Sequence, residues 1–207
     1  SFRDGMYVMA STGWEAKRLI SLEQKLNMSA FGWTPDGKKI VYWHGTPIRF
    51  ALLDPETGQS TEFLAHSKYT IHGARISPDQ KWVAFNTQDG KTSPLWIAAY
   101  RNEEAAEEKD WIRVSGDLGL RPWWSPDGNL LYVVSQRDGQ RCIWVQPLDG
   151  VNKRPKGEAF ALLHAHGARV KIPSALRAFG PAVLPGGLIF GMDEESGNVW
   201  LAEPRVE

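Results

Sequence analysis

Short hydrophobic runs separated by polar turns follow one another along the whole chain. An amphipathic helix would show a longer stretch with apolar positions every three or four residues, whereas a strand needs only a short run bounded by turn residues. Turn residues are plentiful, since the 207 residues include 20 Gly and 13 Pro. This pattern predicts an all-β fold of many short strands joined by tight turns.

One hairpin pattern recurs in residues 33–42, 76–85 and 124–133, and a degenerate copy begins at Leu184. In each of the first three, a Ser or Thr precedes Pro and Asp, and a hydrophobic run follows. Pro presets φ at about −65°, Asp can accept hydrogen bonds from nearby backbone amides, and Gly in the next position tolerates positive φ. The second copy has Gln80 in place of that Gly. The residues predicted to form these turns are Pro35, Asp36, Pro78, Asp79, Pro126 and Asp127.

Two further strands follow each hairpin. Third strands are predicted to begin at Trp96 and Trp144, and fourth strands to cover residues 61–64, 111–114 and 159–163. Four antiparallel strands repeating about every 45 residues form a blade, and blades arranged radially form a β-propeller. A β-sandwich also has short strands and frequent turns, but it gives no reason for the same Ser-Pro-Asp and Trp to recur at a fixed spacing.

The repeats define the expected domain organisation. We expect a single β-propeller domain over residues 1–207, with four-stranded antiparallel blades at 30–67, 72–115 and 119–164 and partial blades at 1–29 and 178–203. The partial blades could join and close a ring of about four blades, or the chain could be an arc of a larger propeller. We expect the arc. Its unpaired strand edges would allow self-association or binding of another strand.

The segment Trp124-Ser125-Pro126-Asp127-Gly128, with the hydrophobic run and the Asp-Gly loop that follow it, resembles the repeat of TolB-like, WD-like β-propellers. The resemblance covers essentially the whole chain. It implies the fold more strongly than a function, because such propellers serve as interaction modules in many contexts. We therefore expect a non-catalytic module of a larger chain or complex that presents a face or rim to a protein partner. The resemblance also implies a periplasmic or otherwise extracytoplasmic location, with a cytoplasmic one as the alternative.

Charge and composition narrow the choice of partners. Lys plus Arg and Asp plus Glu each number 24, and the resulting zero net charge argues against a nucleic-acid partner. The apolar runs are too short to span a membrane. A single cysteine, Cys142, excludes an internal disulfide and any multi-cysteine metal site, and we expect it to be a small buried hydrophobic residue.

Signs of catalysis are absent from the sequence. It contains no Gly-x-Ser-x-Gly nucleophile motif, and Ser77 and Ser125 lie in the predicted turns, where they can bond their own backbone. Similar propellers accompany serine peptidases whose catalytic domain is separate, and nothing in this chain resembles that domain. We expect no enzyme activity, with an accessory role beside a peptidase as an alternative.

A repeated His-Gly-Ala-Arg tetrapeptide supplies candidate ligand-binding residues. Both copies follow a predicted fourth strand, which places them near the central channel, where they would form an anion site for a sensor or an enzyme. In the alternative, each Arg pairs with a neighbouring carboxylate. The four candidates are His72, Arg75, His166 and Arg169.

The tryptophans and the remaining histidines carry less specific signals. Trp33, Trp96, Trp124, Trp144 and Trp200 recur in register and are expected to pack between blades. His164 and His166 would face the same way on an extended segment, but spacing identifies no third ligand. We therefore expect no metal site and no cofactor. The acidic residues between 103 and 110 are expected to form a solvated surface.

Overall fold

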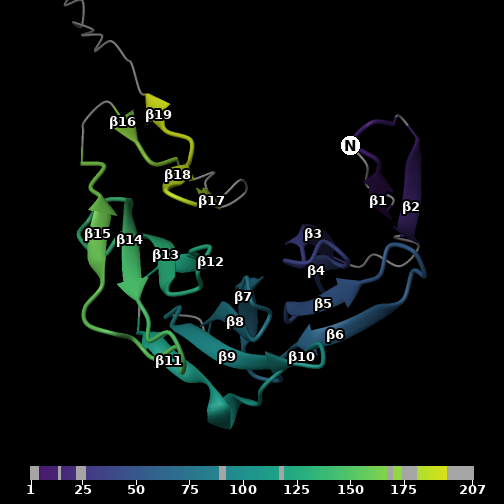
Figure 1. Cartoon of the computed structure of the whole chain (residues 1–207), viewed down its shortest axis with the longest axis horizontal. Coiled ribbons are helices and arrows are strands. Elements are labelled where there is room, and N and C mark those ends of the chain that lie inside the picture. The colour runs from purple at the N-terminus through teal and green to yellow at the C-terminus, as the bar shows by residue number, and fades with distance from the viewer. Residues whose placement is uncertain are drawn as a thin grey trace, which may run out of the picture.

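The computed structural model describes residues 5–13, 15–21, 27–88, 92–116, 119–166, 170–173 and 181–194 (Figure 1). Three antiparallel sheets form its centre, and consecutive strands pair along each of them. The first contains β3 (Met28–Trp33), β4 (Ile40–His44), β5 (Arg49–Leu53) and β6 (Ser60–Leu64). The second contains β7 (Thr70–Ile76), β8 (Trp82–Gln88) and β9 (Leu95–Arg101), and both β10 (Glu104–Ala105) and β11 (Ile112–Ser115) pair with β9. The third contains β12 (Leu120–Trp124), β13 (Leu130–Ser135), β14 (Cys142–Pro147) and β15 (Phe160–Leu163).

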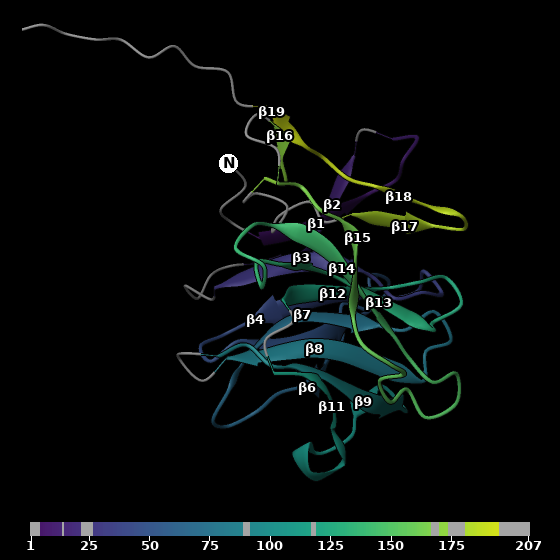
Figure 2. The ribbon, with the colours of Figure 1, turned by 90° about the vertical axis from the view of Figure 1, so that its left-hand side faces the viewer.

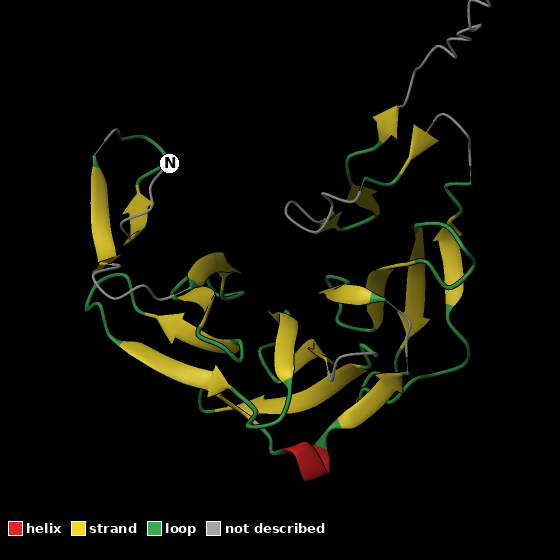
Figure 3. Ribbon diagram, turned by 180° about the vertical axis from the view of Figure 1, so that it is seen from behind, coloured by secondary structure: helices red, strands yellow, loops and turns green. Residues whose placement is uncertain are grey.

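Smaller strand pairs flank these sheets on both sides. On one side β1 (Gly5–Met9) pairs with β2 (Ala16–Ser21). On the other, β17 (Ala182–Leu184) pairs with β18 (Gly187–Ile189), and β16 (Val170–Lys171) pairs with β19 (Asp193–Glu194). The last pair was not predicted, and the part of the predicted partial blade 178–203 that follows residue 194 lies outside the described residues. A 3₁₀ helix, Glu108–Asp110, interrupts the acidic stretch (Figure 3).

The sheets are arranged as blades around one axis. Figure 1 shows β3, β7 and β12 on the inner side of a horseshoe and β6, β11 and β15 on its outer side. In the side view of Figure 2, the strands β3, β7 and β8 run across the picture, along the viewing direction of Figure 1. Among the described strands, neither β1 nor β2 pairs with a strand of the C-terminal pairs, so the arc is open. This arrangement confirms the predicted all-β propeller.

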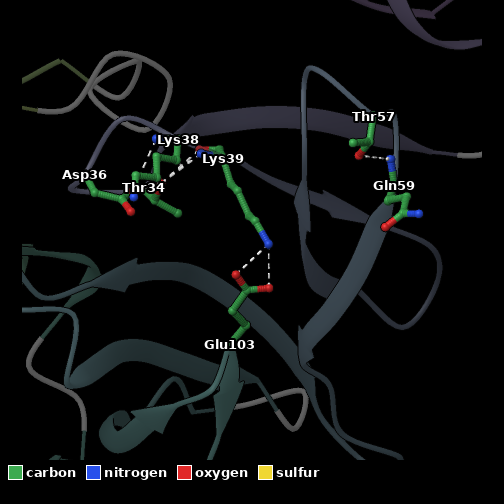
Figure 4. Close-up of polar contacts among 7 residues, drawn as sticks. All are labelled: Thr34, Asp36, Lys38, Lys39, Thr57, Gln59 and Glu103. Carbon is green, nitrogen blue, oxygen red and sulfur yellow. Dashed lines mark hydrogen bonds and ion pairs between the residues drawn. The ribbon is translucent and has the colours of Figure 1, made fainter.

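The three proline turns have nearly identical bonding, which explains why the sequence repeats. In the first, the Thr34 hydroxyl donates to Asp36 Oδ1 at 2.6 Å and accepts from the Lys39 amide at 3.0 Å (Figure 4). In the second, Ser77 makes the same two bonds, at 2.6 Å to Asp79 and 3.0 Å from Trp82. Ser125 and Asp127 repeat the pattern in the third. The hydroxyl donors lower the pKa of both Asp36 and Asp127.

The residue after each aspartate has a left-handed backbone. φ is +70° at Gly37, +55° at Gln80 and +69° at Gly128. A side chain in this region costs about 1 kcal/mol relative to glycine, so Gln80 strains its turn. We expect Gln80→Gly to raise the free energy of unfolding by about 1 kcal/mol, or the melting temperature by about 2–4 °C. Thermal and urea unfolding measure the change.

The matched control reverses the exchange. A Cβ built on Gly37 would meet no atom within 4 Å, so Gly37→Ala tests the backbone cost alone and should destabilise by about the same amount. If Gln80→Gly were neutral or destabilising, the strain assigned to Gln80 would be wrong.

The hydrophobic core is divided among the spaces between successive sheets. One cluster joins the first and second sheets through Val41, Phe50, Ile71 and Phe85, and another joins the second and third through Ile97, Leu131 and Val133. Smaller clusters join the flanking pairs, with Met6 at one end and Ile143 at the other. Each blade is therefore stabilised by its neighbours rather than by a core of its own.

The tryptophans follow the predicted packing with one exception. Trp124 is buried, and Trp96 and Trp144 pack against the same inter-blade clusters. Trp33 is 51% exposed, so the prediction for it is wrong. Trp124 packs on the sheet before it. Trp33 on β3 has no comparable surface among the described residues, because only the two strands β1 and β2 are described before β3. Trp200 lies outside the described residues.

The acidic residues between 103 and 110 do not only form a solvated surface, because two of them contact the neighbouring blade. Glu103 reaches from the second sheet to the first, where its Oε2 lies 2.6 Å from Lys39 Nζ (Figure 4). Glu108 Oε2 lies 2.9 Å from Nε2 of His66, a residue of the segment that follows the first sheet. Such partly exposed pairs contribute at most about 1 kcal/mol each, but both tie neighbouring blades together.

Candidate functional site

Two groups of side chains are candidates for binding. The first lies on the inner strands β3, β7 and β12, where each strand contributes one residue: Phe31, Arg75 and Arg121. The second lies at one end of the third sheet and contains the side chains of Asp138, Cys142, His164 and His166.

Irregular backbone positions the two arginines. The pairing of β7 with β8 shifts register between His72 and Arg75, and the pairing of β12 with β13 shifts between Leu120 and Trp123. Arg121 itself has φ of +59°. Bulges of this kind redirect side chains that regular alternation would place elsewhere. The first His-Gly-Ala-Arg tetrapeptide, residues 72–75, lies within the inner strand β7.

The two guanidinium groups share one aromatic ring. Arg75 Cζ lies 4.3 Å from the centroid of Phe31, and Arg121 Cζ lies 6.0 Å from it. Burial, followed by the nearby charge of Arg121, lowers the pKa of Arg75 to about 10. Arg75 thus keeps its positive charge at neutral pH, although its surroundings disfavour that charge.

No described carboxylate forms an ion pair with Arg75. Its Nε is buried and has no hydrogen-bond partner among the described residues. The alternative in which this arginine pairs with a neighbouring acid is therefore not observed there. A partly buried guanidinium without an ion pair among the described residues is a candidate for binding an anion, since carboxylate and phosphate groups accept hydrogen bonds from guanidinium.

Hydrogen bonds between sheets hold this region in place. The Trp124 indole donates to the Arg75 carbonyl at 2.9 Å. The Asn86 side chain donates to the carbonyl of Gly119 at 2.9 Å and accepts from the amide of Arg121 at 3.0 Å. Both arginines are thus fixed through backbone contacts between the second and third sheets.

The other predicted ligand residues lie in different surroundings. His72 is half-buried on β7 opposite Asn86. His166 belongs to the second group, and Arg169 lies outside the described residues. Of the four predicted residues, the described structure therefore places only His72 and Arg75 on the same inner strand. Arg121 was not predicted, because it has no counterpart in the repeated tetrapeptide.

The second group brings together residues that spacing did not connect. Asp138 lies in the loop between β13 and β14, Cys142 begins β14, and His164 and His166 follow β15. Asp138 Oδ2 lies 3.1 Å from His164 Nδ1 and 3.0 Å from His166 Nε2. Burial raises the pKa of the Cys142 thiol. Spacing in the sequence predicted loop histidines without further ligands, whereas the structure places two candidate donors, Asp138 and Cys142, beside them.

The sheets and their radial order define the chain as a β-propeller. Its fold is that of TolB-like β-propellers, as comparison with solved structures shows. TolB from Acinetobacter baumannii aligns with a TM-score of 0.63 over 91% of this chain and 45% of its own, at 19% identity. A TolB-like protein from Agrobacterium tumefaciens aligns with a TM-score of 0.57 over 76% of this chain and 55% of its own, at 22% identity.

Sequence comparison adds one relative. An uncharacterized protein of Agrobacterium fabrum (strain C58) is 26% identical over 162 residues, which are 72% of this chain and 52% of that protein. No family model matches the chain. The chain spans about half the length of the proteins it matches. None of its described segments forms a helix with the length and apolar character needed to cross a membrane.

Proposed function

We propose that this chain is a non-catalytic binding module whose inner face holds an acidic group of a protein partner. The observation that carries the proposal is the pair Arg75 and Arg121, which approach one ring of Phe31, while Arg75 has no carboxylate partner among the described residues. A partner's Asp, Glu or carboxyl terminus would supply the missing negative charge and accept hydrogen bonds from the guanidinium.

Binding of a short acidic peptide tests this proposal. We expect an acetylated Asp-Glu-Asp peptide to bind saturably in calorimetric titrations at low salt, and binding to weaken as salt rises. Arg75→Gln should weaken it about 10-fold or more, because a charge-assisted bidentate contact is lost. Arg113 provides the control. It also lies over an aromatic ring, 5.8 Å from the centroid of Trp96, but it is exposed on β11, and Arg113→Gln should leave binding unchanged.

The same titration separates a protein partner from a small anionic ligand. If the inner face serves a protein, inorganic phosphate will bind more weakly than the peptide, whose flanking groups add contacts to neighbouring strands. Tighter binding of phosphate would favour the small-anion alternative. Equal binding of the peptide by the wild-type chain and Arg75→Gln would contradict both.

We also propose that the chain acts as an arc of a larger propeller, with blades at residues 30–67, 72–115 and 119–164, in an extracytoplasmic location. Exposed apolar side chains on the outer strand β15 support the larger propeller, and the TolB-like fold supports the location. Phe160 is 49% exposed and Leu162 50%, whereas Phe63 and Leu64 on the outer strand β6 are buried by the following sheet. Light scattering tests whether two copies of the chain cover these side chains. A dimer that Phe160→Lys dissociates would show self-association instead of coverage by a further blade.

A further inference from the structure

The side chains of Asp138, Cys142, His164 and His166 meet at one end of the third sheet. They do so because the sheet is antiparallel: β13 ends, β14 begins and β15 ends on the same side. The register places Ser135 opposite Cys142 and Ile143 opposite Leu163, so the loop and the segment after β15 lie next to each other. Two stretches more than twenty residues apart in sequence thus contribute two donor side chains each.

The distances between the donor atoms fit a tetrahedral metal site. His164 Nδ1 lies 3.4 Å from His166 Nε2, and Cys142 Sγ lies 3.1 Å from His166 Nε2 and 3.7 Å from His164 Nδ1. All four donor atoms lie within 4.8 Å of one another. Bonds of about 2.0–2.3 Å to a tetrahedral zinc ion place nitrogen atoms about 3.3 Å apart and a nitrogen about 3.6 Å from sulfur.

Hydrogen bonding alone does not account for this convergence. A neutral imidazole nitrogen either donates one proton or accepts, and His164 Nδ1 has three polar neighbours within 3.7 Å. One proton cannot serve all three contacts. A cation among four lone pairs would satisfy every donor atom at once.

We propose that Asp138, Cys142, His164 and His166 bind a Zn²⁺ ion. One thiolate, one carboxylate and two neutral imidazoles balance the charge of the ion. The sulfur and nitrogen donors favour Zn²⁺ over Mg²⁺ and Ca²⁺, which take oxygen ligands. Four protein ligands leave no open position, so the ion would stabilise structure and would not catalyse a reaction. It would fix the β13–β14 loop to the segment that leaves β15.

The experiment measures metal binding by the purified chain directly, using Zn²⁺ and Co²⁺ as probes. After removal of bound metal with a chelator, incubation with excess Zn²⁺ and dialysis, we expect one Zn²⁺ per chain by elemental analysis. Co²⁺ should give the strong visible bands of a tetrahedral ion together with a thiolate-to-metal charge-transfer band in the near ultraviolet. Added Zn²⁺ should remove both. Zn²⁺ in about 100-fold excess over its Kd should raise the melting temperature by about 5–10 °C.

Three variants locate the site. Cys142→Ser should abolish the charge-transfer band, and His164→Gln should weaken Zn²⁺ binding by about 100-fold or more. His164 is 54% exposed, so its replacement should leave the fold intact even if Cys142→Ser, which changes a buried residue, fails to fold. Circular dichroism of each metal-free variant checks its fold. His66→Gln is the matched control, and Zn²⁺ binding should be unchanged in it. His66 Nε2 also pairs with a carboxylate, 2.9 Å from Glu108 Oε2, but that pair includes no cysteine.

The outcome is decisive in either direction. Retention of one tightly bound Zn²⁺ by both Cys142→Ser and His164→Gln, or a Co²⁺ spectrum of octahedral type without a thiolate band, would overturn the proposal. Arg75→Gln should bind Zn²⁺ as the wild-type chain does, so failure of the acidic-peptide experiment leaves this test unaffected.

Discussion

Replacing Phe85 with alanine is expected to lower the free energy of unfolding by about 4 kcal/mol. Phe85 lies on β8 and is fully buried in the cluster between the first and second sheets. Its ring meets Trp111 edge to face with centroids 4.7 Å apart. The substitution removes apolar contacts from both sheets and leaves a cavity, and buried Phe→Ala changes cost about 3–5 kcal/mol. Urea unfolding followed by circular dichroism measures the loss.

Phe160→Ala provides the matched control, because the same atoms are removed from a side chain that is 49% exposed on β15. Its expected cost is below about 1 kcal/mol. The contrast depends on the inter-blade cluster being the main source of stability. Equal effects of the two substitutions would show that the sheets do not stabilise one another in this way.

The strands and turns could be predicted because local chemistry determines them. The hydroxyl of Thr34, Ser77 or Ser125 bonds to the aspartate two residues later and to the amide that closes the hairpin, and these contacts span no more than five residues. Each copy of the motif therefore carries its own structure. The repeat then predicts the blades, since equivalent hairpins bury equivalent faces.

The group of Asp138, Cys142, His164 and His166 could not be predicted, because its members are joined only by strand pairing. Cys142 and His164 are 22 residues apart, and Asp138 and His166 are 28 apart. A signal existed, since Cys142 begins a strand whose partner ends just before His164. The cysteine and the histidines are far apart in the sequence, and only the register of β14 with β15 brings them together.

The arginine pair was missed for a different reason. Arg75 and Arg121 occupy inner strands at register shifts, and the hydrophobic pattern does not reveal where a shift falls. Arg121 also has positive φ, which the sequence gives no reason to expect for an arginine. The repeated tetrapeptide drew attention to Arg75, whereas the residue that approaches it belongs to a strand with a different sequence.

Gly73→Ala is expected to destabilise the chain by about 3 kcal/mol and to weaken acidic-peptide binding. Gly73 has φ of +64°, which costs about 1 kcal/mol for any side chain. A Cβ at this position would also lie 2.7 Å from the Cα of Arg121, so β7 and β12 would have to separate. Overpacking of this kind costs about 1–3 kcal/mol more. Urea unfolding and the peptide titration measure the two effects.

Gly58→Ala separates the two causes. Gly58 has a similar φ of +73°, but a Cβ there would meet no atom within 4 Å. This control should lose only the backbone contribution of about 1 kcal/mol and should bind the peptide normally. The difference between the two variants is the cost of moving the inner strands apart. If both lost the same stability, the close approach of Gly73 to Arg121 would not hold the arginine pair in place, and the geometry proposed for the inner face would be wrong.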